Sequence, residues 1–323
     1  MTTKRLPADH DPETTILPFA DGRGHYNANI AKNFFKTFGK KESFEEGHVF
    51  FKLDEKSRKK NIFQKPLSKA LFTKLDSDLF RRKNIHRMFL LTKGEVTLKV
   101  RHRLLDRARA GDIFGEMAVI SEIPDIDVEM HRSATAKAVA PGVAYSLDGA
   151  ETEAGLAQQP EFALMLMSAM FERLRVLTAC LADHAVDDSH KSLRSEPVFD
   201  PATVGTLADR VEKSAVVRFP EGARIIKEKG AGTSMYVVLE GAVGVAVGRR
   251  IVEKIGVGGV FGEMALVDNA PRAATVVARE ECSVLMMNRD ALLALVRNEP
   301  AVGMSMMRSV AERLRYMNSL FDA

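Results

Sequence analysis

The stretch FGEMALVDNAPRAATV occupies residues 261–276, and the related stretch FGEMAVISEIPDIDVEMHRSATA occupies residues 114–136. Both begin with the same five letters, and both end in an arginine followed by small residues. The arginine follows the glutamate by nine residues in the later copy, from Glu263 to Arg272, and by sixteen in the earlier copy. A motif that occurs twice, with different spacings between its glutamate and its arginine, indicates a duplicated unit with extra residues in one copy.

The repeat extends well beyond this phrase. Gly94 and Gly241 lie 147 residues apart, and the same offset separates Glu116 from Glu263. After the longer loop, the offset is 140 over the rest of the two halves. Offsets that hold over long blocks predict two copies of one fold, with insertions only in the first copy.

Each copy is predicted to be mainly β-structure with helices at its ends. Short apolar runs such as MYVVLEGAVGVAV, residues 235–247, are rich in β-branched residues and interrupted by glycine, which favours strands and tight turns. Both tails, residues 161–184 and the segment from Met306 to Phe321, repeat apolar residues at helical spacing. A methionine-rich stripe of this kind is typical of a core or an interface.

The composition excludes several classes of protein. The chain has 323 residues, of which 46% are hydrophobic and 28% charged, as in soluble globular proteins with two domains. No apolar run is long enough to span a membrane, and the polar first thirty residues lack a secretory core. Two cysteines, Cys180 and Cys282, indicate a reducing compartment. We therefore expect a cytoplasmic location.

The later phrase combines the groups that an anionic nucleotide needs. Gly262 lets the backbone approach a ligand, and the turn after it can direct N–H groups at a phosphate. Arg272 offers a planar fork of donors to a phosphate. Glu263 carries two acceptor oxygens that suit ribose hydroxyls. The other interpretation of the same spacing is an ordinary glycine-rich turn with a Glu–Arg surface pair.

The phrase at 261–276 closely resembles the phosphate-binding cassette of the cyclic-nucleotide-binding domain family, which includes protein kinase A regulatory subunits and catabolite-activator-type bacterial regulators. The resemblance covers roughly residues 205–321 and implies a jelly roll with helices at its ends. It further implies that Glu263 takes the ribose 2′-hydroxyl and that Arg272 takes the cyclic phosphate. The residues whose backbone groups would complete the cradle are Gly262, Met264, Ala265 and Ala273.

The resemblance also implies which nucleotide binds. Family members that prefer cGMP tend to carry threonine directly after the arginine, and Ala273 stands there, so the expected ligand is cAMP. The tail helix is expected to close over the base, with Arg313, Tyr316 and Met317 as candidate lid residues. Because the sequence holds no metal-ligand motif and no catalytic constellation, we expect neither a metal ion nor an enzyme.

The first copy is predicted to be a degenerate domain that binds cyclic nucleotide weakly or not at all. It retains Gly115 and Glu116, and Arg132 with Ser133 matches the arginine end of the phrase. Its longer loop carries four carboxylates, which repel a phosphate and one of which could pair with Arg132 instead.

A basic insertion, residues 54–85, lies inside the first copy. Residues 52–87 contain twelve lysines and arginines but only four acidic residues. Phe63, Phe72 and Phe80 are interleaved with the basic residues. Basic residues with aromatics are typical of surfaces that bind nucleic acid or an acidic partner. A solvated loop with a small apolar anchor is the other interpretation.

These features predict the following organisation. Residues 1–27 are a disordered N-terminus, and residues 28–184 are the degenerate cyclic-nucleotide-binding-like domain that carries the insertion. Residues 185–200 are a linker, and residues 201–323 are a cyclic-nucleotide-binding domain. Two tandem jelly rolls are thus the expected fold.

The favoured hypothesis is a cAMP receptor in which cAMP in the second domain drives a conformational change that is passed to an unidentified protein partner. A regulatory subunit of a kinase or another enzyme is the alternative. A nucleic-acid-binding transcription regulator, as many bacterial regulators of this type are, is less favoured, because Ala323 follows the tail helix too closely for a helix-turn-helix. The tail helices could also join two copies into a homodimer.

Overall fold

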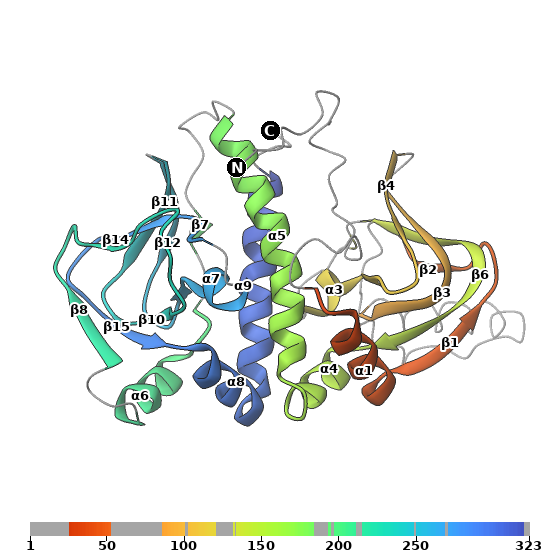
Figure 1. Cartoon of the computed structure of the whole chain (residues 1–323), viewed down its shortest axis with the longest axis horizontal. Coiled ribbons are helices and arrows are strands. Elements are labelled where there is room, and N and C mark those ends of the chain that lie inside the picture. Colours follow the sequence, from red (N-terminus) through yellow and green to blue (C-terminus); the bar gives the residue numbers. More distant parts are fainter. Residues whose placement is uncertain are drawn as a thin grey trace, which may run out of the picture. The chain divides into compact units, whose positions relative to one another are not determined.

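The computed structural model describes residues 26–52, 86–100, 103–120, 132, 134–183, 193–194, 197–210, 215–248, 250–268 and 271–319. The described residues form two compact units, one within Ala28–Thr152 and the other within Glu153–Ala323 (Figure 1). Most of the predicted disordered segment 1–27, the whole basic insertion 54–85, most of the linker 185–200 and the acidic loop 121–131 lie outside the described residues.

The described part of the first unit contains one six-stranded sheet in the order β1-β6-β3-β4, with β2 on β6 and β5 on β3. Its strands are β1 Lys40–Phe44, β2 Val49–Phe51, β3 Met88–Val100, β4 Arg103–Ala108, β5 Ile113–Phe114 and β6 Thr135–Leu147. The helices α1 Ala28–Phe38 and α3 Glu116–Ile120 lie in this unit, and α4 Gly149–Leu156 follows β6. All the pairings between these strands are antiparallel.

Phenylalanines fill the core of the first unit. The ring of Phe50 meets the rings of Phe44, Phe89 and Phe114 in edge-on contacts at centroid distances of 5.0 to 5.1 Å. Phe89 and Phe114 are themselves stacked at 5.2 Å. Such pairs add about 0.5–1.5 kcal/mol each beyond the burial of their area, so Phe114 is firmly held. This fixes the end of β5, directly before Gly115.

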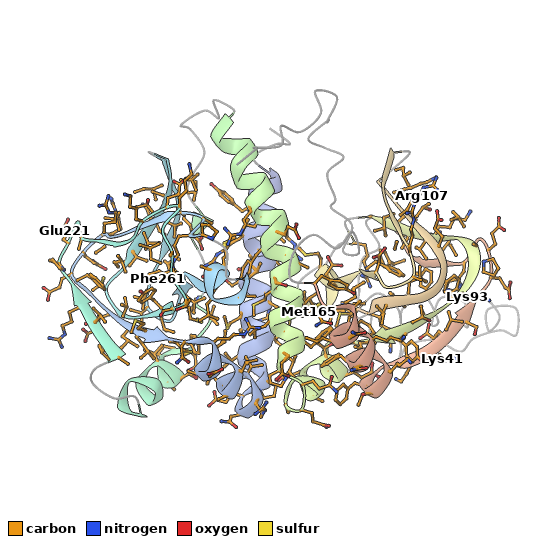
Figure 2. The ribbon with its side chains drawn as sticks, viewed as in Figure 1. Lys41, Lys93, Arg107, Met165, Glu221 and Phe261 are labelled. Carbon is orange, nitrogen blue, oxygen red and sulfur yellow. The ribbon has the colours of Figure 1, made fainter. Side chains whose placement is uncertain are left out.

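Two sheets form the β-structure of the second unit. Among its described residues, a four-stranded sheet has the order β13-β10-β15-β8 and a five-stranded sheet has the order β7-β12-β11-β14-β9. The strands are β7 Leu193–Arg194, β8 Val216–Phe219, β9 Arg224–Ile226, β10 Met235–Glu240, β11 Val243–Val247, β12 Arg250–Ile255, β13 Val260–Phe261, β14 Thr275–Ala278 and β15 Cys282–Met287. Val238, Val243, Phe261 and Val284 join one buried cluster that both sheets supply. In Figure 2, Phe261 is directed into this interior and Glu221 lies on the outside.

The helices of the second unit are α5 Glu161–Asp183, α6 Pro201–Arg210, α7 Glu263–Asp268, α8 Arg289–Asn298 and α9 Pro300–Ser319. The long helices α5 and α9 pack side by side (Figure 1). Both are the tails in which the sequence predicted helices. In the described part of the apolar stripe of α9, Met306, Met307 and Val310 are at most 1% exposed. These three side chains are covered within the chain itself, and the homodimer stays a prediction.

The observed division of the chain differs from the predicted one. The sequence assigned residues 161–184 to the first domain, whereas α5 lies in the second compact unit, which contains Glu153–Ala323. The reason is packing, because the contacts of α5 include those along α9 and with α7. The predicted class, mainly β with flanking helices, is confirmed, while a second copy of the same domain fold remains a prediction. Among the described helices, none is both long and apolar enough to cross a membrane.

Candidate functional site

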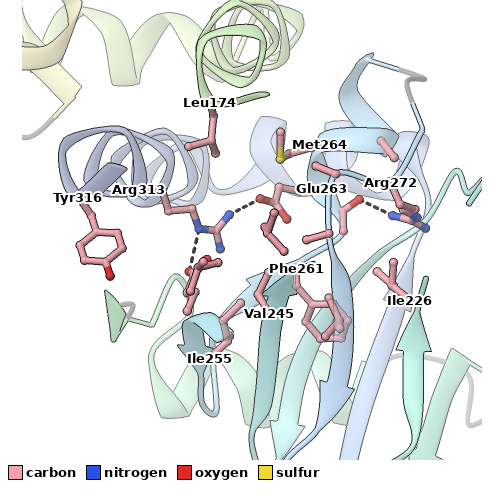
Figure 3. A pocket seen from close by; sticks show the side chains of 18 residues that line it. Leu174, Ile226, Val245, Ile255, Phe261, Glu263, Met264, Arg272, Arg313 and Tyr316 are labelled. Atoms are coloured by element: carbon pink, nitrogen blue, oxygen red, sulfur yellow. Dashed lines mark hydrogen bonds and ion pairs between the residues drawn. The ribbon is translucent and has the colours of Figure 1, made fainter. Parts of the chain in front are cut away.

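A pocket in the second unit brings the predicted site residues together (Figure 3). Its lining includes the six cassette residues that the sequence singled out, namely Gly262, Glu263, Met264, Ala265, Arg272 and Ala273. Arg313 and Tyr316 of α9, two of the lid candidates, also line it, and their role as a lid stays a prediction. The side chain of Met317, the third lid candidate, lies outside the described part of the structure.

The backbone at Gly262 makes the turn that starts the cassette. Its φ is +78°, a value that side-chain-bearing residues rarely adopt. A Cβ atom there would also come within 2.8 Å of Nη1 of Arg272. The helix α7 begins at the next residue, Glu263, and the N–H groups of its first turn have no partner inside the helix. The glycine is therefore required both for the turn and for the position of the arginine.

Arg272 is a buried cation held by the backbone around it. Its side chain donates from Nη1 to the carbonyl oxygen of Gly262 at 2.7 Å, and the residue is 6% exposed. Backbone hydrogen bonds with Lys229 and Gly230 fix its main chain. Desolvation lowers the pKa of Arg272, while Tyr236 and Glu263 act in the opposite direction. A guanidinium that has lost much of its hydration gains from an anionic ligand.

Gly232 lies directly against this arginine. A Cβ atom on Gly232 would sit 2.7 Å from Cζ of Arg272, which is closer than real contacts allow. The absence of a side chain at this position is therefore part of how the guanidinium is placed. The sequence analysis did not single out Gly232, because nothing in the phrase at 261–276 indicates which loop faces the arginine.

Glu263 already has a partner in the chain. Arg313 donates from Nη1 to Oε1 of Glu263 and from Nε to Oε1 of Glu253 at 2.9 Å, and both contacts are drawn as dashed lines in Figure 3. A third bond runs from Nη2 to the carbonyl oxygen of Val260 at 2.9 Å. Burial acts to lower the pKa of Arg313, but the two carboxylates outweigh it and raise the pKa. The helix α9 is thus tied to both β12 and the cassette.

Glu253 is a pocket residue that the sequence analysis missed. It is 6% exposed and lines the pocket together with Ile255. The two residues are separated by one position on β12, so both side chains fall on the same face of the strand. An acid at an inward position of a strand was the available signal in the sequence.

The helix α5 also reaches the site. Leu174 lines the pocket, and Nη1 of Arg175 donates to the carbonyl oxygen of Pro271 at 2.8 Å. Pro271 directly precedes Arg272, so this bond supports the chain next to the phosphate-binding candidate. The sequence analysis did not predict these residues as part of the site, because they belong to the helical tail of the first copy.

The phrase of the first unit keeps a similar local geometry. Gly115 has a φ of +80°, and Arg132 is 3% exposed. Arg132 donates from Nη1 to the carbonyl of Gly115 and from Nη2 to that of Arg87, both at 3.0 Å. Its guanidinium carbon lies 4.0 Å above the centre of the Phe51 ring. Arg132 thus binds the glycine at the start of its own motif, as Arg272 does, although the loop between them is longer.

Two further residues complete the predicted weak site. Glu116 begins α3 and is 5% exposed. Ser133 and the four loop carboxylates lie outside the described residues, so the expected pairing of Arg132 with a loop acid stays a prediction. Among the described residues, no group of three or more His, Cys, Asp or Glu is arranged to hold a metal ion.

Comparison with known proteins finds a family model that is similar to the second β-structure. Residues 216–299 match the family model described as "Cyclic nucleotide-binding domain". This part of the chain is thus similar to a cyclic nucleotide-binding domain. The match includes Glu263 and Arg272, two of the charged residues that line the pocket.

Relatives of the cyclic nucleotide-binding domain include regulators of two kinds. The CRP-like cAMP-activated global transcriptional regulator of Mycobacterium tuberculosis is 27% identical over 127 residues, which are 37% of this chain and 54% of that protein. The cAMP-dependent protein kinase regulatory subunit of Colletotrichum orbiculare is 28% identical over 191 residues, 58% of this chain and 41% of that protein. The chain spans about half the length of the curated relatives it matches.

Two solved structures are also similar to parts of this chain. The catabolite activator protein of Thermus thermophilus is 31% identical, with 39% of this chain and 62% of that chain covered and a TM-score of 0.33. The cAMP-bound structure titled PfPKA-R is 18% identical, with 92% of this chain and 87% of that chain covered and a TM-score of 0.32.

Proposed function

We propose that the second unit is a cytoplasmic cAMP receptor that regulates a protein partner and has no catalytic activity of its own. The observation that carries this proposal is the presence of Glu263 and Arg272 in one pocket of a cyclic nucleotide-binding domain. Arg272 would hold the cyclic phosphate with its planar fork, and Glu263 would accept a hydrogen bond from the ribose 2′-hydroxyl.

The rest of the pocket suits a purine base. Its wall beyond the cassette is largely apolar, with Val245, Val252 and Ile255 from the sheet and Leu174 from α5. Such a surface favours the flat faces of a base. Ala273, which also lines the pocket, has no hydroxyl to offer to guanine, and this supports cAMP over cGMP.

The link to a partner would pass through α9. Arg313 of this helix is bonded to Glu263, so a ligand that engages Glu263 changes a contact that anchors α9. A difference of a few kcal/mol between two positions of α9 is enough for a ligand to shift their populations. We propose that a partner protein reads this shift, in keeping with the regulatory names of the relatives.

Calorimetric titration of the purified chain with cAMP tests the binding step. Binding of cAMP that is tighter than that of cGMP, and that Glu263→Ala weakens, supports the receptor. No binding of cAMP at millimolar concentration would overturn it. A pull-down from cell extract with and without cAMP tests the second step, because a true partner should be captured in only one of the two conditions.

The alternative function is that of a cAMP-responsive regulatory subunit of a kinase. The similarity to the fungal kinase regulatory subunit extends over 191 residues, far beyond the 216–299 range of the family model. Co-purification of a catalytic subunit that cAMP releases would favour this alternative. Binding to DNA, with log affinity falling linearly with log salt, would instead favour a transcription regulator.

A further inference from the structure

The guanidinium of Arg313 binds two buried carboxylates, those of Glu253 and Glu263, and only Glu263 is assigned to the ligand. Under the proposed function, Glu263 is the ribose acceptor, so its oxygens must serve both Arg313 and the nucleotide. Glu253 stands on β12, is 6% exposed and accepts from Nε of Arg313 at 2.9 Å. It lies in the wall of the same pocket and binds a different nitrogen of the guanidinium than Glu263 does.

The planar guanidinium makes these two contacts depend on each other. Its donors point in fixed directions, and Nε serves Glu253 while Nη1 serves Glu263. A buried cation without a second counter-ion relies entirely on the one that remains, because each buried charge must be compensated. Without the charge of Glu253, Arg313 would be compensated by Glu263 alone, and Glu263 would be harder to share with a ligand.

We propose that Glu253 is a positioning residue of the nucleotide site, which holds Arg313 so that Glu263 can accept the ribose 2′-hydroxyl. It thereby sets the preference of the pocket for a ribonucleotide over its 2′-deoxy form. Glu253 itself touches Arg313 and not the ligand. The proposal rests on the proposed function, because it assigns the ribose to Glu263.

A purely structural role for Glu253 makes a different prediction. If the ion pair of Glu253 and Arg313 only fastens α9 to β12, its loss weakens every ligand of the pocket to the same extent. If Glu253 makes Glu263 available, its loss weakens a ligand with a 2′-hydroxyl more than one without it. The ratio of the affinities for cAMP and 2′-deoxy-cAMP separates the two roles.

The experiment titrates the full chain with both nucleotides in a calorimeter. A hydrogen bond to a carboxylate predicts that the unsubstituted chain prefers cAMP over 2′-deoxy-cAMP by roughly 10- to 150-fold. Glu253→Gln keeps the shape and an acceptor oxygen but removes the charge, and it should lower this ratio at least threefold. Equal weakening of both nucleotides, with an unchanged ratio, overturns the proposal.

Two controls identify the cause of a lowered ratio. Glu240→Gln removes a carboxylate of the same domain that accepts from Ser283 Oγ at 2.7 Å and does not line the pocket, so the ratio should stay unchanged. In an Arg313→Met background, Glu253→Gln should no longer alter the ratio, because the cation that connects the two glutamates is gone. A continued response there contradicts the assigned route through Arg313.

Thermal melts accompany each variant. Should Glu253→Gln fail to fold, Glu253→Asp decides, since it keeps the charge but draws the carboxylate back by one methylene and lengthens its contact with Arg313. A lowered ratio supports the proposal, and an unchanged ratio overturns it. If the unsubstituted chain binds neither nucleotide, the proposed function fails as well. If it binds cAMP without preference over the 2′-deoxy form, cAMP binding stands and the role of Glu253 fails.

Discussion

At the scale of single residues, Arg272 is the group on which ligand binding should depend most. We expect Arg272→Ala to weaken cAMP binding by about 2–5 kcal/mol, because it removes one member of a desolvated charge pair. That corresponds to a loss of roughly 30-fold to several thousand-fold in affinity. Titration calorimetry measures the loss. Arg224→Ala, at an exposed arginine of β9, is the matched control and should leave the affinity unchanged. Equal binding by the two variants would contradict the role of Arg272.

Gly232 should matter because of the space that it leaves. In Gly232→Ala, the added methyl group would meet the guanidinium of Arg272 and force it away from its bond to Gly262. Overpacking of this kind costs about 1–3 kcal/mol, so we expect cAMP affinity to fall by roughly 5- to 150-fold. Gly256→Ala is the control, because nothing lies within 4 Å of a Cβ atom there. Unchanged affinity in Gly232→Ala would show that Arg272 does not need this position.

Arg132 should act on stability and not on ligand binding. Two carbonyl oxygens and the Phe51 ring occupy its guanidinium in the first unit. Its loss removes the donor of a buried carbonyl at Arg87 and of a half-buried one at Gly115, at about 1–3 kcal/mol, and removes a cation–π contact. We expect Arg132→Ala to lower the melting temperature of the first unit while cAMP affinity changes less than about twofold. Weakening of cAMP binding as large as that of Arg272→Ala would show that the longer cassette also binds nucleotide.

At the scale of elements, α5 supports a cassette from which it is far removed in sequence. Arg175→Leu should loosen the chain at Pro271, since it removes the bond from α5 to that carbonyl. A hydrogen bond of this kind contributes about 0.5–1.5 kcal/mol, so cAMP affinity should fall by roughly 2- to 12-fold. Calorimetry at constant salt provides the measurement.

The control for α5 is an arginine that contacts this helix away from the cassette. Arg297 of α8 lies 3.7 Å from Glu161 of α5, and its side chain is 55% exposed. Arg297→Leu should leave cAMP binding unchanged, because exposed ion pairs contribute little. If both variants weaken binding alike, the effect comes from the general stability of α5 and not from the bond to Pro271.

At the scale of the whole molecule, the two cassettes should not be equivalent. The guanidinium of Arg132 in the first unit contacts two carbonyls and a ring, whereas the guanidinium of Arg272 lines the pocket and donates to the carbonyl of Gly262. We therefore expect the full chain to bind about one cAMP. Calorimetric stoichiometry tests this, and two equivalent sites per chain would contradict the predicted degeneracy of the first copy.

Much of the cassette was predictable because it is local in the sequence. The glycine that turns the chain, the glutamate that starts α7 and the arginine after the turn lie within eleven residues, Gly262 to Arg272. Their backbone conformation follows from short-range sterics, and the positive φ of Gly262 is one example. The class of the fold was predictable for a similar reason, because alternation along a strand and helical spacing are local patterns.

The sequence by itself determined the cassette, the strands around it and the helical tails. Only the tertiary structure decided which distant residues complete the pocket. Leu174, Arg175 and Glu253 reach the site because α5 packs with α7 and α9 and because β12 forms a wall of the pocket. The tertiary structure also decided that Arg313 is bonded to Glu253 and Glu263 and that α5 lies in the second unit. Contacts between segments far apart in the chain depend on which apolar faces meet, and no local pattern specifies that choice.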